Sequence, residues 1–517
     1  MPTLTNLELT SLLPEELPVS VVGIIATVVI GIIYSVLMKE RPLAGFPLVV
    51  VEGQTPRNSW LYHARRLIIE AQKKHSGAFQ VMTGTGPKII LPNRYADELR
   101  NNPFVNFNKA FMKDFFIDYP GFEPYKQGLA DATLVPETVR VKLTQSLNLI
   151  TDDLVDETTA SVHDIYGEDP EWKAISLRNS VADIVARLSS RVFLGKTLCR
   201  DKRWLEITKT YTIESFIGSY LLRLIPVLLR PLVHWFIPQC KACRTAIRDA
   251  HKLIDPEVER RKAAVDDALR RGVKPPKTAD TIGWMYEVAR GRHVDYVAGQ
   301  LSLTLAAIHT TTEALSTAML DICEFPETLP ELRKEIVEVI SEHGWAKTSL
   351  YKLKLMDSFL KESQRLSPTD MTSMNRWVEK EITLSDGTAL PKNSRISVLT
   401  NYDDPSIYPE PEKFDAARFL KMRQQPGNEN AWQVVSTSAD HMAFGHGQHA
   451  CPGRFFATNE IKIALCHLLL KYDWQFLPGE GRPEASSMES TTSVSPTGRV
   501  QYRRRVAEID LDNVNLG

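Results

Sequence analysis

The longest apolar run in the chain is Val19 to Met38, twenty residues without a charge. An α-helix of that length spans about 30 Å, the thickness of the hydrocarbon core of a bilayer. A cleaved signal peptide is the alternative, but the run is too long and no small-residue cleavage site follows it. Lys39 and Arg41 come directly after the run, whereas the charged side chains before it, Glu8, Glu15 and Glu16, are all acidic. The positive-inside tendency therefore predicts one transmembrane helix, with the rest of the chain in the cytosol.

The pattern after this run is mostly helical, with apolar residues repeating at helical spacing. Strand-like alternation is confined to three places: Gln80 to Pro92, Ile382 to Val398 and the residues near Val500. Within the second of these, Ser385 to Gly387 (SDG) predicts the turn of a hairpin. We expect a mainly α protein with small β-sheets (α+β), divided into an anchor with a proline-rich connector (1–45) and one large domain (46–517).

A second apolar region, Tyr211 to Pro238, is interrupted by Arg223, Arg230 and several prolines, which would break a spanning helix. Two interpretations are about equally favoured: a segment lying on the bilayer surface, or an ordinary pair of buried helices. In both, we expect the arginines to keep contact with water or lipid headgroups.

Composition narrows the function only by exclusion. A net charge of -1 gives no electrostatic basis for binding nucleic acid. The six cysteines are scattered, unlike the dense spacing of a disulfide scaffold, so we expect reduced thiols in a cytosolic compartment.

One of these cysteines, Cys451, stands in an unusual setting, FGHGQHACPGRFFA. Gly445, Gly447 and Gly453 permit tight backbone geometry around it, and Pro452 stands where a helix is expected to begin. A cysteine at a helix N-terminus is favoured as the thiolate, which can bind iron. The alternative for a lone cysteine is a buried structural thiol.

The stretch FGHGQHACPG resembles the haem-ligand signature of the cytochromes P-450, because Phe444, Gly447, Cys451 and Gly453 all match it. The resemblance implies a cytochrome P-450 fold and haem b (iron protoporphyrin IX) with the Cys451 thiolate as the axial iron ligand. It also implies that the matching residues contact the cofactor. His449 replaces the arginine that usually contacts a haem propionate in this family.

Two further motifs resemble those of the family. Glu362 and Arg365 form an ExxR pair, whose members share one helix face. Arg418, in FDAARF, resembles the family's second arginine, and the resemblance implies a buried network of the three that shapes the cysteine loop. Because ExxR is common, the alternative is an exposed surface pair that contributes about 0.3 kcal/mol.

An apolar helical pattern from about Val294 to Cys323 resembles the family's oxygen-binding helix. Thr310 matches its catalytic threonine, while His309 stands in place of the usual acid and Ala307 in place of glycine. The resemblance therefore implies proton delivery by Thr310 and His309, and histidine can relay protons near neutral pH. The alternative is that the threonine hydroxyls bond to carbonyls of the preceding turn.

Two more arginines resemble family contacts to the haem propionates. Arg376 lies eleven residues after Arg365, close to the usual place of such an arginine. Arg140 matches the arginine of a WxxxR motif, although Pro136 occupies the tryptophan position.

The resemblance implies a monooxygenase that uses dioxygen. No dinucleotide-binding fingerprint or flavin domain is apparent, so electrons must come from elsewhere. The resemblance implies that a separate NADPH-cytochrome P-450 reductase in the same membrane supplies them. Together with the anchor, this predicts the endoplasmic reticulum membrane, with the catalytic domain in the cytosol. A haem-thiolate isomerase or dehydratase that acts without dioxygen and a non-catalytic haem sensor are the alternatives.

The sequences of these motifs are most similar to those of fungal family members that oxidise terpenoids and related secondary metabolites. This resemblance implies a small hydrophobic substrate. The aromatic stretch Phe104 to Tyr125 falls where the family places a substrate-contacting loop. Its aromatic side chains can line an apolar pocket or belong to the core.

Overall fold

The computed structural model describes residues 41–129 and 134–513. The apolar run Val19 to Met38 lies outside these residues, so the predicted transmembrane helix stays a prediction. Within the described ranges, no helix combines the length and hydrophobicity that a membrane crossing requires.

Helices make up most of the described chain. They are α2 (Pro56–Lys74), α3 (Ala96–Leu99), α4 (Phe107–Phe115), α5 (Glu123–Leu129), α6 (Leu134–Glu137), α7 (Leu147–Tyr166), α8 (Leu177–Leu194), α9 (Lys202–Leu224), α10 (Arg230–Val233), α11 (Pro238–Arg270), α12 (Thr281–Ala289), α13 (Tyr296–Glu324), α14 (Leu329–His343), α15 (Lys347–Lys352), α16 (Lys354–Leu366), α17 (Arg418–Arg423) and α18 (Arg454–Lys471). A π-helical segment, Thr138–Leu143, follows α6.

The strands are short and form small sheets, as expected for the mainly α class. They are β1 (Phe79–Thr83), β2 (Gly86–Leu91), β3 (Val105–Asn106), β4 (Lys173–Ser176), β5 (Thr372–Val378), β6 (Ile382–Thr383), β7 (Ala389–Leu390), β8 (Arg395–Leu399), β9 (Tyr472–Gln475), β10 (Ser486–Met488), β11 (Thr491–Ser493) and β12 (Arg499–Arg504). The three predicted strand regions are thus confirmed, whereas β5 and several shorter strands were not predicted.

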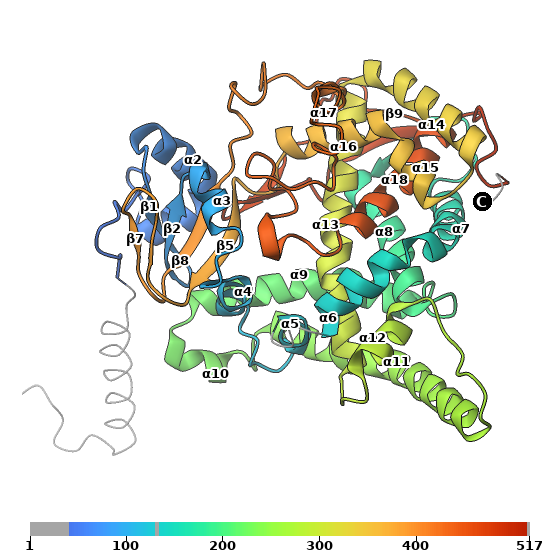
Figure 1. The fold of residues 1–517 in the computed structure, drawn as a ribbon, viewed down its shortest axis with the longest axis horizontal. Coiled ribbons are helices and arrows are strands. Elements are labelled where there is room, and N and C mark those ends of the chain that lie inside the picture. The colour runs from blue at the N-terminus through green and yellow to red at the C-terminus, as the bar shows by residue number, and fades with distance from the viewer. Residues whose placement is uncertain (1–40, 130–133, 514–517) are drawn as a thin grey trace, which may run out of the picture.

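Helix α13 runs through the middle of the molecule and packs against α8, α16 and α18 (Figure 1). Its sequence is apolar around most of its circumference, which suits a helix that has neighbours on several sides. The Asp295 side chain caps its first turn by accepting a hydrogen bond from the backbone N–H of Ala298 (2.9 Å). The predicted bounds, Val294 to Cys323, are confirmed to within two residues.

A five-stranded sheet in the order β1-β2-β8-β5-β3 lies at one side of the helices (Figure 1). The pairing of β2 with β8 is parallel, and the other pairs are antiparallel. Strand β5 carries a bulge between Ser373 and Arg376, where Met374 has a φ of 54°. The predicted hairpin is confirmed as the β6–β7 pair, in which Ile382 faces Leu390.

The region Tyr211 to Pro238 combines features of both interpretations offered for it. Its first part continues α9, which is buried along one face, and its second part is an exposed apolar surface. That surface, called here the apolar patch, consists of Leu224, Val227, Leu228, Leu229, Leu232, Trp235 and Phe236.

Both arginines of this region keep a partly exposed surface, as expected, and both also have partners within the protein. The Arg223 side chain is 12% exposed and donates to Glu489 Oε1 (3.1 Å). Arg230 donates to the Ile225 carbonyl (2.9 Å) and lies over the Phe116 ring. Protein groups therefore supply much of the contact that was expected from water or lipid headgroups.

Candidate active site

The cysteine loop, residues 444–453, is tied to itself and to the N-terminal part of the chain. The Cys451 N–H donates to the Phe444 carbonyl (2.8 Å), which closes the loop. Gly447 has a φ of +73°, and an added Cβ would lie 2.3 Å from the Arg100 carbonyl oxygen. The Gln448 N–H donates to that same carbonyl (3.2 Å). Glycine is therefore required at 447 both for its backbone conformation and for the close approach of Arg100.

Gly453 does not depend on the backbone freedom of glycine. Its backbone is an ordinary N-cap (φ −87°), so no positive φ calls for glycine. An added Cβ would lie 3.7 Å from Val139 Cγ1 and 4.0 Å from Cys451 Sγ, which are ordinary contact distances. Among the described residues, nothing therefore requires glycine at 453 on steric grounds.

Helix α18 begins at Arg454 rather than at Pro452, so Cys451 stands just before the helix. Burial raises the pKa of the Cys451 thiol, while hydrogen bonds from the Gly453 and Arg454 backbone and the Arg454 charge act in the opposite direction. The backbone N–H groups at the start of α18 thus favour the thiolate in the predicted direction, while burial, which the sequence did not reveal, has the larger and opposite effect. A bound metal ion would itself favour the deprotonated sulfur.

The structure brings Glu362, Arg365 and Arg418 together in a buried network. Arg365 binds the Glu362 carboxylate with two parallel N–H···O bonds of 2.8 Å, and Arg418 Nε donates to the same carboxylate (3.0 Å). The Glu362 and Arg365 side chains are at most 1% exposed, which excludes the exposed surface pair. The remaining N–H groups of the two arginines donate to backbone carbonyls of Tyr402, Pro409, Glu410, Pro411 and Lys413.

Tyr402 links this network to the cysteine loop. Its carbonyl accepts from Arg365 (2.7 Å), while its hydroxyl accepts from the Met442 N–H (3.1 Å), two residues before Phe444. Sequence reasoning missed Tyr402, because nothing in its local pattern distinguishes it from a core tyrosine.

A second missed contact involves His446, which lies between Gly445 and Gly447 in the cysteine loop. Its Nε2 contacts Asp97 Oδ1 (2.9 Å), and Asp97 in turn pairs with Arg100 (3.1 Å). The histidine inside the cysteine-loop motif was the feature of the sequence that could have indicated this contact.

The middle of α13 has an exposed strip although the helix is central in the fold. Ala306 and Thr310, one turn apart, are exposed, whereas Ile308 and Thr311 are buried. Exposed side chains on a helix packed between others face an internal space. Thr310 is thus placed as an oxygen-helix threonine would be, and its hydroxyl also donates to the Ala306 carbonyl (2.7 Å), as the alternative expected.

His309 faces away from this strip. Its Nε2 lies 3.0 Å from the Lys209 carbonyl in α9, so the ring bridges α13 and α9. Burial, together with the charge of Arg178, lowers the pKa of His309 to about 4, so the ring is neutral at pH 7. A ring held in this way is badly placed to relay protons to the strip near neutral pH.

Arg376, His449 and Arg140 lie near one another beside the cysteine loop. Arg376 is buried, and its Nε and Nη2 have no partner among the described residues. Burial lowers its pKa to about 10. His449 lies beside the Phe107 ring (6.2 Å), and its pKa is lowered by burial and by the charges of Arg376 and Arg140. Arg140 is exposed, in the π-helical segment.

This arrangement fits a cofactor with carboxylate groups. Two unpartnered N–H donors on a desolvated guanidinium match the two oxygens of one carboxylate. The haem propionates supply such groups, so the donor set around Arg376 agrees with the cofactor that Cys451 implies.

The aromatic stretch Phe104 to Tyr125 packs mainly as a core of its own. Phe111, Phe115 and Tyr125 stack on one another, with ring centroids 4.3 and 4.6 Å apart. Leu305, next to the exposed Ala306 on α13, packs against the same cluster. The cluster therefore borders the internal space while being largely buried in itself.

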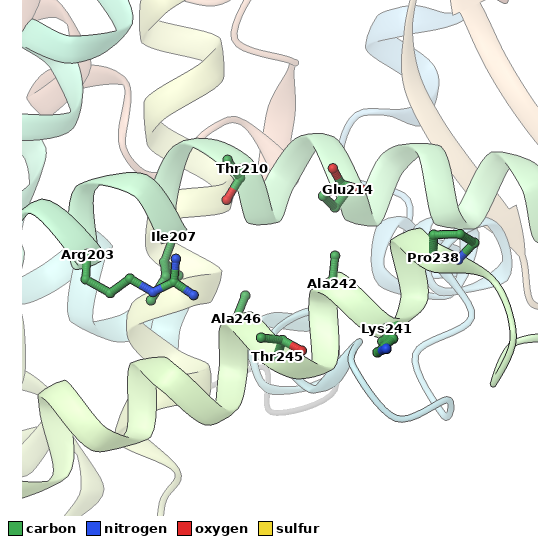
Figure 2. Close-up of a pocket in the computed structure, with 9 residues that line it drawn as sticks. All are labelled: Arg203, Ile207, Thr210, Glu214, Pro238, Lys241, Ala242, Thr245 and Ala246. Carbon is green, nitrogen blue, oxygen red and sulfur yellow. The ribbon is translucent and has the colours of Figure 1, made fainter.

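A groove of about 400 Å³ lies elsewhere, between α9 and α11 (Figure 2). Its lining includes Arg203, Glu214 and Thr245, and none of the predicted site residues contributes to it. It is therefore a surface groove that shares no lining residue with the cysteine loop or with the exposed strip of α13.

Replacing Glu362 by Gln should prevent haem incorporation. A neutral amide cannot satisfy two buried guanidinium groups, and breaking such a pair costs roughly 3–5 kcal/mol. The purified variant should show a Soret absorbance near zero relative to its protein absorbance, together with an earlier urea midpoint. Glu410→Gln is the control, since Glu410 pairs with Lys413 in solvent. Wild-type haem content in Glu362→Gln would contradict the role of the network.

Gly447→Ala should distort the cysteine loop, because the added Cβ meets the Arg100 carbonyl. The matched control is Gly427→Ala, where φ is also positive (+86°) but nothing lies within 4 Å. The control should lose only the about 1–2 kcal/mol of a left-handed alanine. We expect Gly447→Ala alone to lose the carbon monoxide spectrum of thiolate ligation, and equal behaviour of the two variants would disprove the steric account.

Comparisons with known proteins agree with this site. The family model described as Cytochrome P450 matches residues 134–503. The chain is 47% identical to Cytochrome P450 monooxygenase bsc2 of Alternaria brassicicola, covering 92% of each chain, and 40% identical to Cytochrome P450 monooxygenase calE of Penicillium decumbens, covering 95% of this chain and 96% of the other. A retinoic-acid-bound cyanobacterial CYP120A1 shares the fold, with a TM-score of 0.64 at 18% identity, over 90% of this chain and 99% of the other. The chain belongs to the cytochrome P450 family, oxygen-incorporating oxidoreductases that hold haem through a cysteine thiolate.

Proposed function

We propose that the protein is a membrane-anchored monooxygenase that oxidises a small hydrophobic secondary metabolite, a terpenoid by preference. It takes dioxygen and draws electrons from a separate NADPH-cytochrome P450 reductase. The observation that carries the proposal is the arrangement around Cys451: a cysteine loop fixed by its own backbone and by the Arg100 carbonyl, and Arg376 with two buried N–H donors that have no partner among the described residues.

Each side chain of the site has a separate task in this proposal. Cys451 would hold the haem iron, Arg376 and Arg140 would neutralise the propionates, and His449, whose pKa is lowered, would offer them a hydrogen bond from its neutral ring. Phe444 closes the loop over the sulfur side through its carbonyl bond to Cys451. The haem, when bound, supplies the redox chemistry of oxygen activation, which a thiolate ligand favours.

The exposed strip on α13 is where the substrate and the proton supply meet. Thr310 presents its hydroxyl oxygen to the internal space while its proton bonds to the Ala306 carbonyl. A hydroxyl held in this way can accept a hydrogen bond and pass a proton along by exchange. His309 serves to hold α13 against α9, and we do not assign it the proton relay.

The substrate preference rests on the apolar surroundings of the strip. Leu305 and the aromatic cluster of α4 and α5 border the space, so a ligand there is surrounded by rings and aliphatic groups. A hydrocarbon skeleton with few polar groups, such as a terpenoid, suits such a lining.

The membrane assignment rests on two segments. The run Val19 to Met38 has the length of a transmembrane helix, which defines 1–45 as anchor and connector and 46–517 as the catalytic domain. The apolar patch exposes Trp235 and Phe236 by 52% and 76%, which suits contact with the lipid surface. Both features favour the endoplasmic reticulum membrane, where the reductase and lipid-soluble substrates are confined beside the enzyme.

Cys451→Ser should abolish the Soret shift that reduced thiolate-bound haem shows with carbon monoxide. Cys323→Ser is the matched control, because Cys323 is also half-buried and lies on α13 away from the loop. The control should keep the wild-type spectrum. A wild-type protein that folds yet takes up no haem would overturn the proposal.

Labelled dioxygen separates the monooxygenase from the alternatives. Full-length protein, reductase, NADPH and candidate terpenoids should yield a product that carries one labelled oxygen atom. Product without label would favour an isomerase or dehydratase, and haem binding with no product from a broad terpenoid panel would favour a sensor.

A further inference from the structure

The family's acid is absent beside Thr310, but another carboxylate lies one turn further along α13. At about 100° per residue, Glu313 is rotated by about 20° from the exposed Ala306, whereas His309 is rotated by about 60°. Glu313 is also closer to Thr310 around the helix, at about 60° against about 100°. Around the helix axis, Glu313 therefore leaves α13 closer to the direction of the exposed strip than His309 does, and at i+3 it is a neighbour of Thr310 on the helix surface.

Glu313 is held by two donors from distant parts of the chain. Arg178 Nε donates to Oε1 (2.6 Å), and the Val494 N–H donates to Oε2 (2.7 Å). Each oxygen thus accepts one bond from the protein and keeps further accepting capacity. A carboxylate with spare lone pairs can also bind water.

Arg178 connects this carboxylate to the edge of the protein. It is the second residue of α8, which packs along α13 (Figure 1). The side chains of Arg178 and Glu313 are 16% and 11% exposed, so the pair lies at the boundary between interior and solvent. The pair is therefore partly accessible to water.

The same arginine explains why His309 does not take this task. Its positive charge adds to burial in disfavouring a protonated imidazole. Arg178 therefore disfavours a protonated ring at His309 while its Nε binds the carboxylate of Glu313.

We propose that Glu313, held by Arg178, is the positioning residue that supplies protons to Thr310, in place of the acid that the family usually has beside this threonine. The inference rests on the proposed function. In the overall reaction, substrate C–H, dioxygen, two electrons from NADPH and two protons give substrate C–OH and water. The carboxylate takes each proton from solvent, releases it toward the Thr310 hydroxyl and is ionised again.

The test compares Glu313→Gln with Glu324→Gln in the full-length holoenzyme, with reductase and an accepted substrate. Glu324 is a matched control, because it lies on the same helix and also pairs with an arginine, Arg482. We expect Glu313→Gln to lower product formed per NADPH consumed by roughly tenfold to a hundredfold, with the excess electrons released as hydrogen peroxide. The solvent deuterium isotope effect on product formation should rise, and Glu313→Asp should restore part of the yield.

Two spectroscopic readouts separate proton supply from a merely structural role through Val494. The carbon monoxide spectrum and the substrate-induced Soret shift should match the wild type, with the substrate Kd changed less than about threefold. The inference is overturned if yield and isotope effect in Glu313→Gln equal those of the control, or if substrate binding is lost together with yield. Failure of the proposed function is distinct, because it would appear in the wild type as missing haem or unlabelled product.

Discussion

One buried carboxylate, that of Glu362, organises the half of the molecule that carries the cysteine. Between β8 and α17 the chain forms no regular element, so its backbone carbonyls need donors from elsewhere. Arg365 and Arg418 provide them, and both guanidinium groups can be buried only because Glu362 neutralises them. The irregular segment is thereby fixed, and through Tyr402 so is the approach to the cysteine loop.

The cysteine loop is constrained from the opposite side as well. Gly447 packs against the Arg100 carbonyl, and His446 contacts Asp97 in α3. Elements from the start and the end of the chain thus meet at the loop. Protein contacts on both sides thus hold the backbone of the loop that carries the sulfur, which is the kind of preorganisation that a catalytic centre requires.

Local patterns in the sequence predicted the features that depend on near neighbours. The bounds of α13 and the β6–β7 hairpin agree with the structure, because periodicity and turn residues encode them directly. The grouping of Glu362 with two arginines also agrees, but it was implied by resemblance to a known family rather than by spacing. Features that depend on distant partners were missed or misjudged. Arg223 finds its partner 266 residues away, and His309 turns toward α9 rather than the strip, which no local pattern reveals.

The pKa of the Cys451 thiol likewise depends on features that the local sequence does not reveal. The helix N-terminus was visible in the sequence, but the burial that opposes it depends on how the whole chain folds. Strand β5 was missed for a related reason, since its sequence TSMNRWV alternates only weakly and its pairing partners lie elsewhere in the chain.

The bulge in β5 separates two contacts that this short strand makes near the cysteine loop. Before it, the Ser373 hydroxyl donates to the Met442 carbonyl at the base of the cysteine loop, and after it Arg376 lies over Phe107. The single extra residue around Met374 sets the phase between these two contacts. The number of residues in β5 is therefore as constrained as their identity. Deleting one residue at the bulge would leave the neighbouring residue types unchanged, but it would turn the side chain of Arg376 to the opposite face of the sheet.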